Sequence, residues 1–275
     1  IDELLDEAEL GGGEHHKERL AKRGKLPVRE RVFHFLDPDS PFLEISGLAA
    51  FKSDYPVGGG AIAGIGVSSG IECIIFANDP TVLAGAMHFY SVKKWMRAMQ
   101  IARDSRLPFI QFVESAGGDL RPRSNAVVGG TTHFAESGRQ FYEITELSKL
   151  NIPTVTVTFG TATAGGAYQP GMSDYNIFVK DQADVALAGP PLVQMATGEI
   201  SSREDIGGAK MHAEKSGLAE YLAEDDLDGI RIAREVMSHL NWEKEGTNPR
   251  FSVEKPLYDQ DCLLYTSPSP RDLDL

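Results

Sequence analysis

The chain has 275 residues, of which 41% are hydrophobic and 24% charged, an ordinary composition for a globular protein with a sizeable core. Its formal net charge of −13 argues against nucleic acid or an anionic membrane as a partner, because both need clustered Lys and Arg. Two cysteines are too few for a disulfide framework or a cysteine zinc site, which favours a reducing compartment. No run approaches the ~18 apolar residues of a membrane span. No signal peptide is evident, and the start without Met predicts a fragment edge.

The spacing of apolar residues predicts an alternation of helices and strands after three N-terminal helices. In chain order we expect helices over 1–10, 14–23 and 28–36, a hairpin over 61–67 and 72–77, a helix over 92–103, a strand over 109–113, a loop over 117–132, a helix over 134–150, a strand over 154–159, a helix or turn from 167, a strand over 185–188 and a helical turn over 191–197. This order predicts an α/β fold with a mixed sheet. The polar segment 246–255 predicts a linker.

Three predicted strands run into glycines. They are followed by Gly117 and Gly118, by Gly165 and Gly166, and by Gly189. A glycine at the carboxyl end of a strand lets a backbone N–H face open space, and a following helix adds the positive end of its dipole. Two such junctions side by side could form an oxyanion hole for a thioester carbonyl. The simpler interpretation is that all three are tight turns.

Other motifs point to no cofactor. The run 57–63 fits G-x-G-x-x-A, but a hairpin follows it where a dinucleotide site needs a helix. The seven histidines show no metal-ligand spacing beyond the adjacent pair His15 and His16. Ser115 is not in a nucleophile elbow. We therefore expect no bound metal and no serine nucleophile.

Two groups of cations are candidates for binding a phosphorylated ligand. Lys93 and Arg97 are four residues apart and share a helix face, and Lys94 lies beside them. Arg23 and Lys25 form the second group. The alternative for both groups is a solvated charged face.

The motifs together resemble one family, the carboxyltransferase β subunits of biotin-dependent acyl-CoA carboxylases. The resemblance extends to about Trp242 and rests on blocks in this order: RGKL (23–26), RER (29–31), ANDPTV (77–82), VKK (92–94), ESAGG (114–118), TAGGAY (163–168), MSD (172–174), GPPLV (189–193), GGAKMH (207–212) and SGLA (216–219). The sequence around GPPLV and Glu199 is more similar to the methylcrotonoyl-like branch of the family than to the propionyl type.

The resemblance implies a crotonase-like fold, a spiral of ββα units, in which this half binds the CoA thioester. It implies that the N–H groups of Gly165 and Gly166 stabilise the enolate oxygen, with Gly117 and Gly118 beside them. Ala164 and Tyr168 would then line the substrate site, although ordinary packing is the better account of Tyr168 alone. Carboxybiotin, carried on a biotin carboxylase or biotin carrier partner, would donate the carboxyl group, and released biotin could take the proton.

The family subunit is about twice this length, so we expect residues 1–250 to be its N-terminal domain and 251–275 a linker with a tail unlike the family. The resemblance implies a homo-oligomer in which N and C halves face each other, located in the bacterial cytoplasm or the mitochondrial matrix. Three alternatives remain: the related acyl-CoA decarboxylase of sodium-pumping complexes, a hydratase or isomerase using Glu114, and a non-catalytic CoA-binding or assembly fragment.

Overall fold

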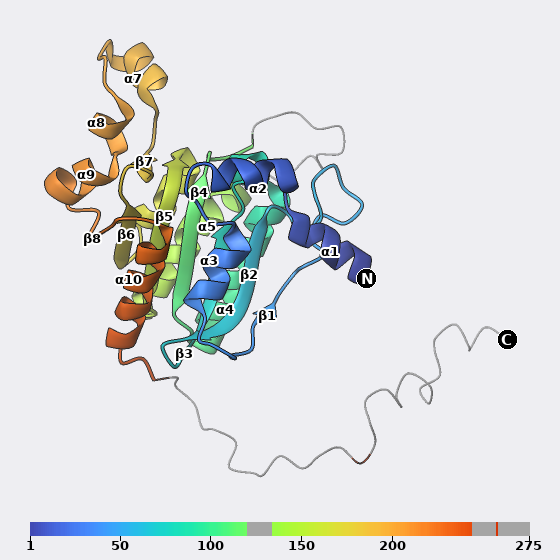
Figure 1. Cartoon of the computed structure of the whole chain (residues 1–275). Helices are drawn as coiled ribbons and strands as arrows, with labels where there is room; N and C mark the ends of the chain where they lie inside the picture. Colours follow the sequence, from blue (N-terminus) through green and yellow to red (C-terminus); the bar gives the residue numbers. More distant parts are fainter. Residues whose placement is uncertain (120–133, 244–256, 258–275) are drawn as a thin grey trace. The chain divides into compact units, whose positions relative to one another are not determined.

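The computed structural model describes residues 1–119, 134–243 and 257, with the side chains of helix α5 described from residue 138 onward (Figure 1). Residues Ile1–Lys244 form one compact unit. Most of the predicted loop 117–132, the predicted linker and the predicted tail lie outside the described residues. None of the described helices combines the length and apolar character that crossing a bilayer requires.

Eight strands of the described chain form a single mixed sheet in the order β1-β2-β3-β4-β5-β6-β8, and β7 also pairs with β5. The strands are β1 (Leu43–Glu44), β2 (Ala61–Ser68), β3 (Ile71–Asn78), β4 (Phe109–Ser115), β5 (Thr154–Thr163), β6 (Tyr175–Val179), β7 (Asp184–Ala186) and β8 (Tyr221–Ala223). The first three strands pair antiparallel and all later pairs are parallel. The carboxyl ends of β4 and β5 therefore meet at one edge, where ligands commonly bind in α/β folds.

Helices cover both faces of this sheet. The longer helices are α1 (Asp2–Leu10), α2 (Glu14–Ala21), α3 (Val28–Phe35), α4 (Phe89–Ser105), α5 (Phe134–Lys149), α7 (Pro190–Thr197) and α10 (Asp226–His239). The short ones are η1 (Leu83–Gly85), η2 (Ala164–Ala167), α6 (Tyr168–Gly171), α8 (Arg203–Gly207), α9 (Ala209–Met211) and η3 (His212–Ser216). Two of the three hydrophobic clusters in the described part of the chain lie on opposite faces of the sheet, one between the sheet and α4 with α5, the other between the sheet and α3 with α10.

Strand residues alternate between these two clusters. Ile74 packs with Trp95 on the α4 side, whereas its neighbour Ile75 packs with Phe35 and Met237 on the opposite side. Because both faces are buried, the central strands read as continuous apolar runs and not as alternating ones. This explains why 109–113 and 154–159 were recognisable as strands from sequence, although each extends further toward the site.

The predicted α/β organisation, the hairpin and the helices are confirmed, with ends shifted by a few residues. The sequence interpretation did not include β1, β6, β8 or the long helix α10. A start signal for α10 is present, since the Asp225 carboxylate accepts a hydrogen bond from the N–H of Asp228. The three missed strands have two to five residues, too short for a periodic pattern.

Asp37 joins the hairpin turn to α10. Its carboxylate accepts hydrogen bonds of 2.8 Å from the N–H groups of Ser69 and Gly70 and pairs with Arg234 at 2.8 Å. Burial opposes ionisation of Asp37, but these donors outweigh it and hold the pKa of the carboxyl below its ordinary value of 3.8. The ionised form is therefore part of the packing between the turn and α10.

We expect Asp37→Asn to lower the free energy of unfolding by about 1 kcal/mol near neutral pH. Because the pKa of Asp37 is depressed in the folded state, its contribution is present above the unfolded pKa and is lost as the pH falls through the folded pKa. Urea unfolding of the wild type and the variant between about pH 7 and pH 3 should show a difference in the free energy of unfolding that shrinks at the acid end. A difference independent of pH would show that it does not come from the charge on Asp37.

Candidate active site

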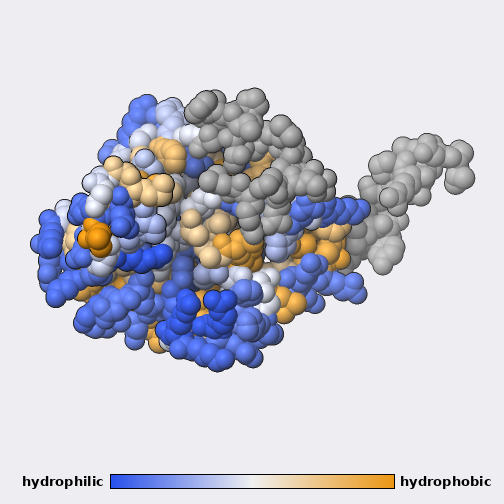
Figure 2. All heavy atoms as spheres, turned by 90° about the horizontal axis from the view of Figure 1, so that it is seen from above, coloured by the Kyte–Doolittle hydropathy of each residue, from blue (hydrophilic) through white to orange (hydrophobic). Residues whose placement is uncertain are grey.

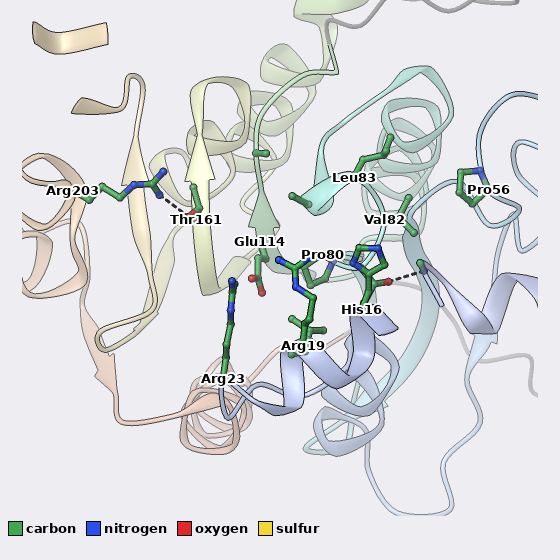
Figure 3. A pocket seen from close by; sticks show the side chains of 15 residues that line it. His16, Arg19, Arg23, Pro56, Pro80, Val82, Leu83, Glu114, Thr161 and Arg203 are labelled. Atoms are coloured by element: carbon green, nitrogen blue, oxygen red, sulfur yellow. Dashed lines mark hydrogen bonds between the residues drawn. The ribbon is translucent and has the colours of Figure 1, made fainter. Parts of the chain in front are cut away.

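A cavity of about 630 Å³ opens beside the carboxyl ends of β4 and β5 (Figure 3). The lining comes mostly from α2, the 80–84 turn, the ends of both strands and α8. It consists of Gly12, His16, Arg19, Leu20, Arg23, Pro56, Pro80, Thr81, Val82, Leu83, Ala84, Glu114, Ala116, Thr161 and Arg203. Seen from above, the molecule carries mostly hydrophilic residues with apolar patches between them (Figure 2). The lining combines apolar side chains such as Leu20 and Val82 with the cations Arg19, Arg23 and Arg203, a composition suited to an acyl chain and an anionic group.

The two glycine loops predicted to be neighbours are neighbours. Ser115 of β4 pairs with Ala162 of β5, so the loops after these residues begin side by side. A Cβ on Gly166 would lie 3.0 Å from Cβ of Ser115, and one on Gly117 would lie 2.9 Å from the carbonyl oxygen of Thr163. Each loop therefore needs a glycine where it crosses the other.

The other glycine of each pair has no close neighbour among the described residues. A Cβ on Gly118 or on Gly165 would meet none of their atoms within 4 Å. Ala116, which directly precedes Gly117, lines the cavity. The sequence could indicate two glycine pairs, but only the structure divides them into two crossing positions and two open positions.

The backbone turns sharply at Ala164. Its φ of 52° is in the left-handed region, where a residue with a Cβ is strained. Gly165 and Gly166 follow in the first turn of η2, whose N–H groups have no acceptor inside the helix. The backbone N–H groups of Gly165 and Gly166 thus follow directly after a strained turn at the end of β5. Leu83 and Ala84, which line the cavity, are also left-handed, with φ of 52° and 53°.

Glu114 lies in the cavity wall but belongs to a chain of buried ion pairs. Its carboxylate accepts from Lys25 at 2.5 Å and from Arg31 at 3.1 Å. Arg31 also pairs with Asp226 at 3.0 Å and lies over the ring of Phe159. A glutamate with two cationic partners is poorly suited to the role of a free general base, which a hydratase or isomerase would require of it.

The candidate phosphate-binding cations fall into different environments. Arg23 is exposed and lines the cavity, together with Arg19 and His16 on α2 and Arg203 on the opposite wall (Figure 3). Arg203 donates to Thr161 at 3.3 Å and to Asp184 at 3.1 Å. Sequence reasoning missed Arg19, His16 and Arg203. The helical spacing of positions 16, 19 and 23 could have indicated one basic face.

Lys25 and Lys94 are buried and bonded to protein groups. Lys94 donates to the carbonyl oxygens of Ala61 at 2.7 Å and Gly58 at 3.3 Å. Burial and, to a smaller extent, the nearby Arg29 lower the pKa of Lys94 to about 8, although the Glu44 carboxylate opposes this shift. Both lysines therefore bind groups of the protein itself, whereas the sequence predicted that they contact phosphate. Neither lysine is among the CoA contacts that we propose.

Lys93 and Arg97 are exposed on α4, as the spacing indicated, and neither lines the cavity. The Lys93 ammonium lies over the ring of Phe89, and Arg97 donates to Gln100. Tyr168 is partly exposed and packs against Phe141, with ring centroids 4.4 Å apart. Gly189 caps α7 and is not a cavity residue. Within the described ranges, no three His, Cys, Asp or Glu side chains gather as a metal site.

Comparison with known proteins identifies the family. The carboxyl transferase domain model matches residues 19–272. The chain belongs to this family. A probable biotin-dependent acyl-coenzyme A carboxylase β2 subunit of Mycobacterium tuberculosis is 47% identical over 267 residues, which are 96% of this chain and 49% of the relative. The methylcrotonoyl-CoA carboxylase β chain of Dictyostelium discoideum is 41% identical over 98% of this chain and 46% of its own length.

Solved carboxyltransferase structures share the fold. The β subunit of Pseudomonas aeruginosa geranyl-CoA carboxylase superposes with a TM-score of 0.82 at 41% identity, covering 98% of this chain and 48% of that one. The transcarboxylase 12S structure, described as a hexamer with methylmalonyl-coenzyme A bound, gives 0.77 at 26% identity, covering 86% and 46%. The expected crotonase-like fold and carboxyltransferase family are thus confirmed. The carboxyl transferase chain spans about half the length of these relatives.

Proposed function

We propose that this carboxyl transferase domain binds an acyl-CoA and stabilises its enolate while a carboxyl group is transferred to it. The observation that supports this best is the pair of crossing glycine loops at the adjacent ends of β4 and β5, beside a cavity with a cationic rim. Carboxybiotin on a partner protein would supply the carboxyl group, as the names of the biotin-dependent relatives suggest.

The chemistry requires a donor at the thioester oxygen. Removing a proton from the acyl group places negative charge on that oxygen, and fixed N–H donors stabilise the charge without reorganisation. The N–H groups of Gly165 and Gly166 would be these donors, with Gly117 and Gly118 shaping the facing wall and Ala164 setting the turn. The experiment that tests the function is carboxyl transfer by the full-length subunit to a panel of acyl-CoAs, with no transfer to any of them contradicting it.

The cations at the cavity rim are the proposed contacts for the CoA phosphates. Arg19 on α2 and Arg23 in the turn after it extend toward the cavity, and Arg203 reaches it from the opposite wall (Figure 3). Guanidinium groups bind phosphate oxygens in a bidentate manner, so a few of them suffice in a protein of net charge −13.

We expect Arg19→Glu/Arg23→Glu to weaken acyl-CoA binding to this chain by roughly 10–100-fold, which is about 1.4–2.8 kcal/mol for the two contacts together, because solvent screens exposed charge pairs. Isothermal calorimetry with 3-methylcrotonoyl-CoA measures the change. The loss should be smaller for the corresponding acyl-pantetheine, which lacks the nucleotide phosphates.

Lys93→Glu/Arg97→Glu is the matched control, since it reverses two exposed charges on α4 away from the cavity. Its dissociation constant should stay close to that of the wild type. A large loss in this control together with normal binding by Arg19→Glu/Arg23→Glu would move the phosphate site to α4, the other location that the sequence indicated.

The three alternative functions differ in what this site must do. A hydratase or isomerase would need Glu114 free, whereas it is bound to Lys25 and Arg31. An assembly fragment would need no acyl-CoA site. A decarboxylase would use the same enolate site in the reverse direction, and none of the relatives named above is a decarboxylase. Acyl-CoA binding with carboxylation of the enolate is therefore the function that the site supports best.

We also propose that α7 contributes to a contact with the second half of a partner subunit. The segment around it exposes large apolar side chains: Leu187, Leu192, Met195 and Ile200, the last two being more than four-fifths exposed. No residue of α7 is buried, and the helix stands off the end of the sheet in Figure 1. An uncovered apolar helix of eight residues is poorly stable in water, so a partner surface would stabilise it.

Met195→Glu/Ile200→Glu should therefore weaken self-association of the full-length subunit. Charges in the centre of an apolar contact must be desolvated, which favours the dissociated species. Sedimentation at several concentrations measures the effect, and Lys210→Glu, an exposed change on α9, serves as the control. Unchanged association of the double variant would exclude α7 from the interface.

A further inference from the structure

A chain of four buried charges links three distant parts of the sequence. Lys25 and Arg31 come from the α2–α3 region, Glu114 from the end of β4, and Asp226 from the start of α10. Asp226 also accepts a hydrogen bond from the N–H of Leu26 at 3.0 Å. The side chains of Arg31 and Asp226 are 1% and 2% exposed, and those of Lys25 and Glu114 are 7% and 13% exposed. With two positive and two negative groups, the cluster is electrically balanced.

The fold makes specific room for the Glu114 side chain. A Cβ on Gly160 of β5 would lie 2.7 Å from the Glu114 carboxyl group, so a larger residue there would displace it. The main chain of Glu114 is equally enclosed, because a Cβ on Gly85 would collide with its carbonyl oxygen. Residue 114 is thus held at both its side chain and its backbone.

Any movement of Glu114 would be transmitted to the proposed oxyanion hole. Ser115 is the next residue, and its Cβ is the atom nearest to a Cβ placed on Gly166. The N–H of Gly117 donates to the hydroxyl of Ser115 at 3.2 Å, and the N–H of Ala116 donates to the carbonyl of Ala84 at 3.1 Å. The segment from 114 to 117 therefore fixes one side of the loop that contains Gly165 and Gly166.

We propose that Glu114 is a positioning residue for enolate stabilisation, acting through its ion pairs with Lys25 and Arg31 to hold the Ser115–Gly118 loop against Gly166. This inference rests on the proposed function of the glycine loops. It gives Glu114 a role that requires no proton transfer. Lys25 shares this positioning role, because it is the buried partner that neutralises the Glu114 carboxylate.

The test measures polarisation of the thioester carbonyl directly. The chain is saturated with 3-methylcrotonoyl-CoA labelled with ¹³C at the thioester carbonyl, and the chemical shift of the bound carbonyl reports hydrogen bonding to its oxygen. Calorimetry on the same samples gives the dissociation constant. Absence of binding or of a downfield shift in the wild-type chain would refute the proposed function itself and, with it, the positioning role of Glu114.

Glu114→Gln, which keeps the shape and removes the charge, should bind the ligand within about threefold of the wild type but lose at least half of the carbonyl shift. Lys25→Arg, which keeps the charge, should retain the shift. Lys25→Met/Glu114→Gln keeps the cluster balanced and provides a folded protein if the single variant does not fold; it should also lose the shift. Glu44→Gln, which breaks a partly buried ion pair with Arg29 outside the cavity lining, is the control and should retain it.

A full carbonyl shift in folded Glu114→Gln and in the double variant would overturn the inference. If these variants kept the full shift while the full-length subunit carrying Glu114→Gln lost turnover, Glu114 would be a proton-transferring group and not a positioning residue. Equal loss of the shift in Glu44→Gln would show a general effect of destabilisation, which also contradicts a specific role for Glu114.

Discussion

Gly165→Val is expected to abolish polarisation of the bound thioester carbonyl and to reduce carboxyl transfer by roughly 10²–10³-fold, with little change in the stability of the fold. The expectation follows from the space around this residue. A Cβ on Gly165 would meet no atom of the described residues within 4 Å, so the added side chain enters the space proposed for the acyl-CoA oxygen. The backbone φ of Gly165 is not in the left-handed region, so a side chain adds no backbone strain.

The neighbouring glycines supply the comparison for this prediction. Gly171→Val is the matched control, because Gly171 also faces open space but lies at the far end of α6. It should keep both the carbonyl shift and the rate. Gly166→Val should also abolish transfer, but its Cβ would press on Ser115, so its melting temperature should fall as well. Normal transfer by Gly165→Val would exclude these amides as the oxyanion hole.

The sequence predicted that the two glycine loops are adjacent better than it predicted the surroundings of the charged residues. The glycine pairs could be found because a strand followed by Gly-Gly is a local signal, and two such strands in a parallel sheet end at the same edge. The crossing of Gly117 with Thr163 is a tertiary contact between segments with no shared local pattern. Resemblance to the family suggested the proposed substrate class, an acyl-CoA, which neither composition nor periodicity could indicate.

Charged residues show the limit of local reasoning most clearly. Arg23 and Lys25 are two residues apart and looked equivalent, yet Arg23 is exposed at the cavity and Lys25 is buried beside Glu114. The difference is decided by a partner 89 positions away in the chain. Lys94 is likewise buried against the 58–61 segment, while its neighbour Lys93 is exposed. Helical periodicity could separate these two faces but could not identify which one was buried.

Arg31→Met is expected to lower the free energy of unfolding by about 3–5 kcal/mol, the largest stability change that we predict. Arg31 is 1% exposed and is the only described residue that pairs with both Glu114 and Asp226. Methionine fills much of the volume, but it leaves Asp226 buried with only the N–H of Leu26 as a described partner. An uncompensated buried charge costs much more than a lost surface pair.

Urea unfolding of Arg31→Met, followed by circular dichroism, measures this loss. Arg29→Met is the matched control on the same helix, since its pair with Glu44 is partly exposed at 32% and 24% and should contribute only about 1 kcal/mol. The double variant Arg31→Met/Asp226→Asn should be more stable than Arg31→Met alone, because it removes the charge left without a partner. If the losses in the free energy of unfolding from the two changes instead add, the destabilisation by Arg31→Met comes from lost packing on Phe159 and not from the isolated Asp226 carboxylate. The carbonyl shift of each variant that still folds then shows whether the buried charges, beyond stabilising the fold, hold the glycine loops in place.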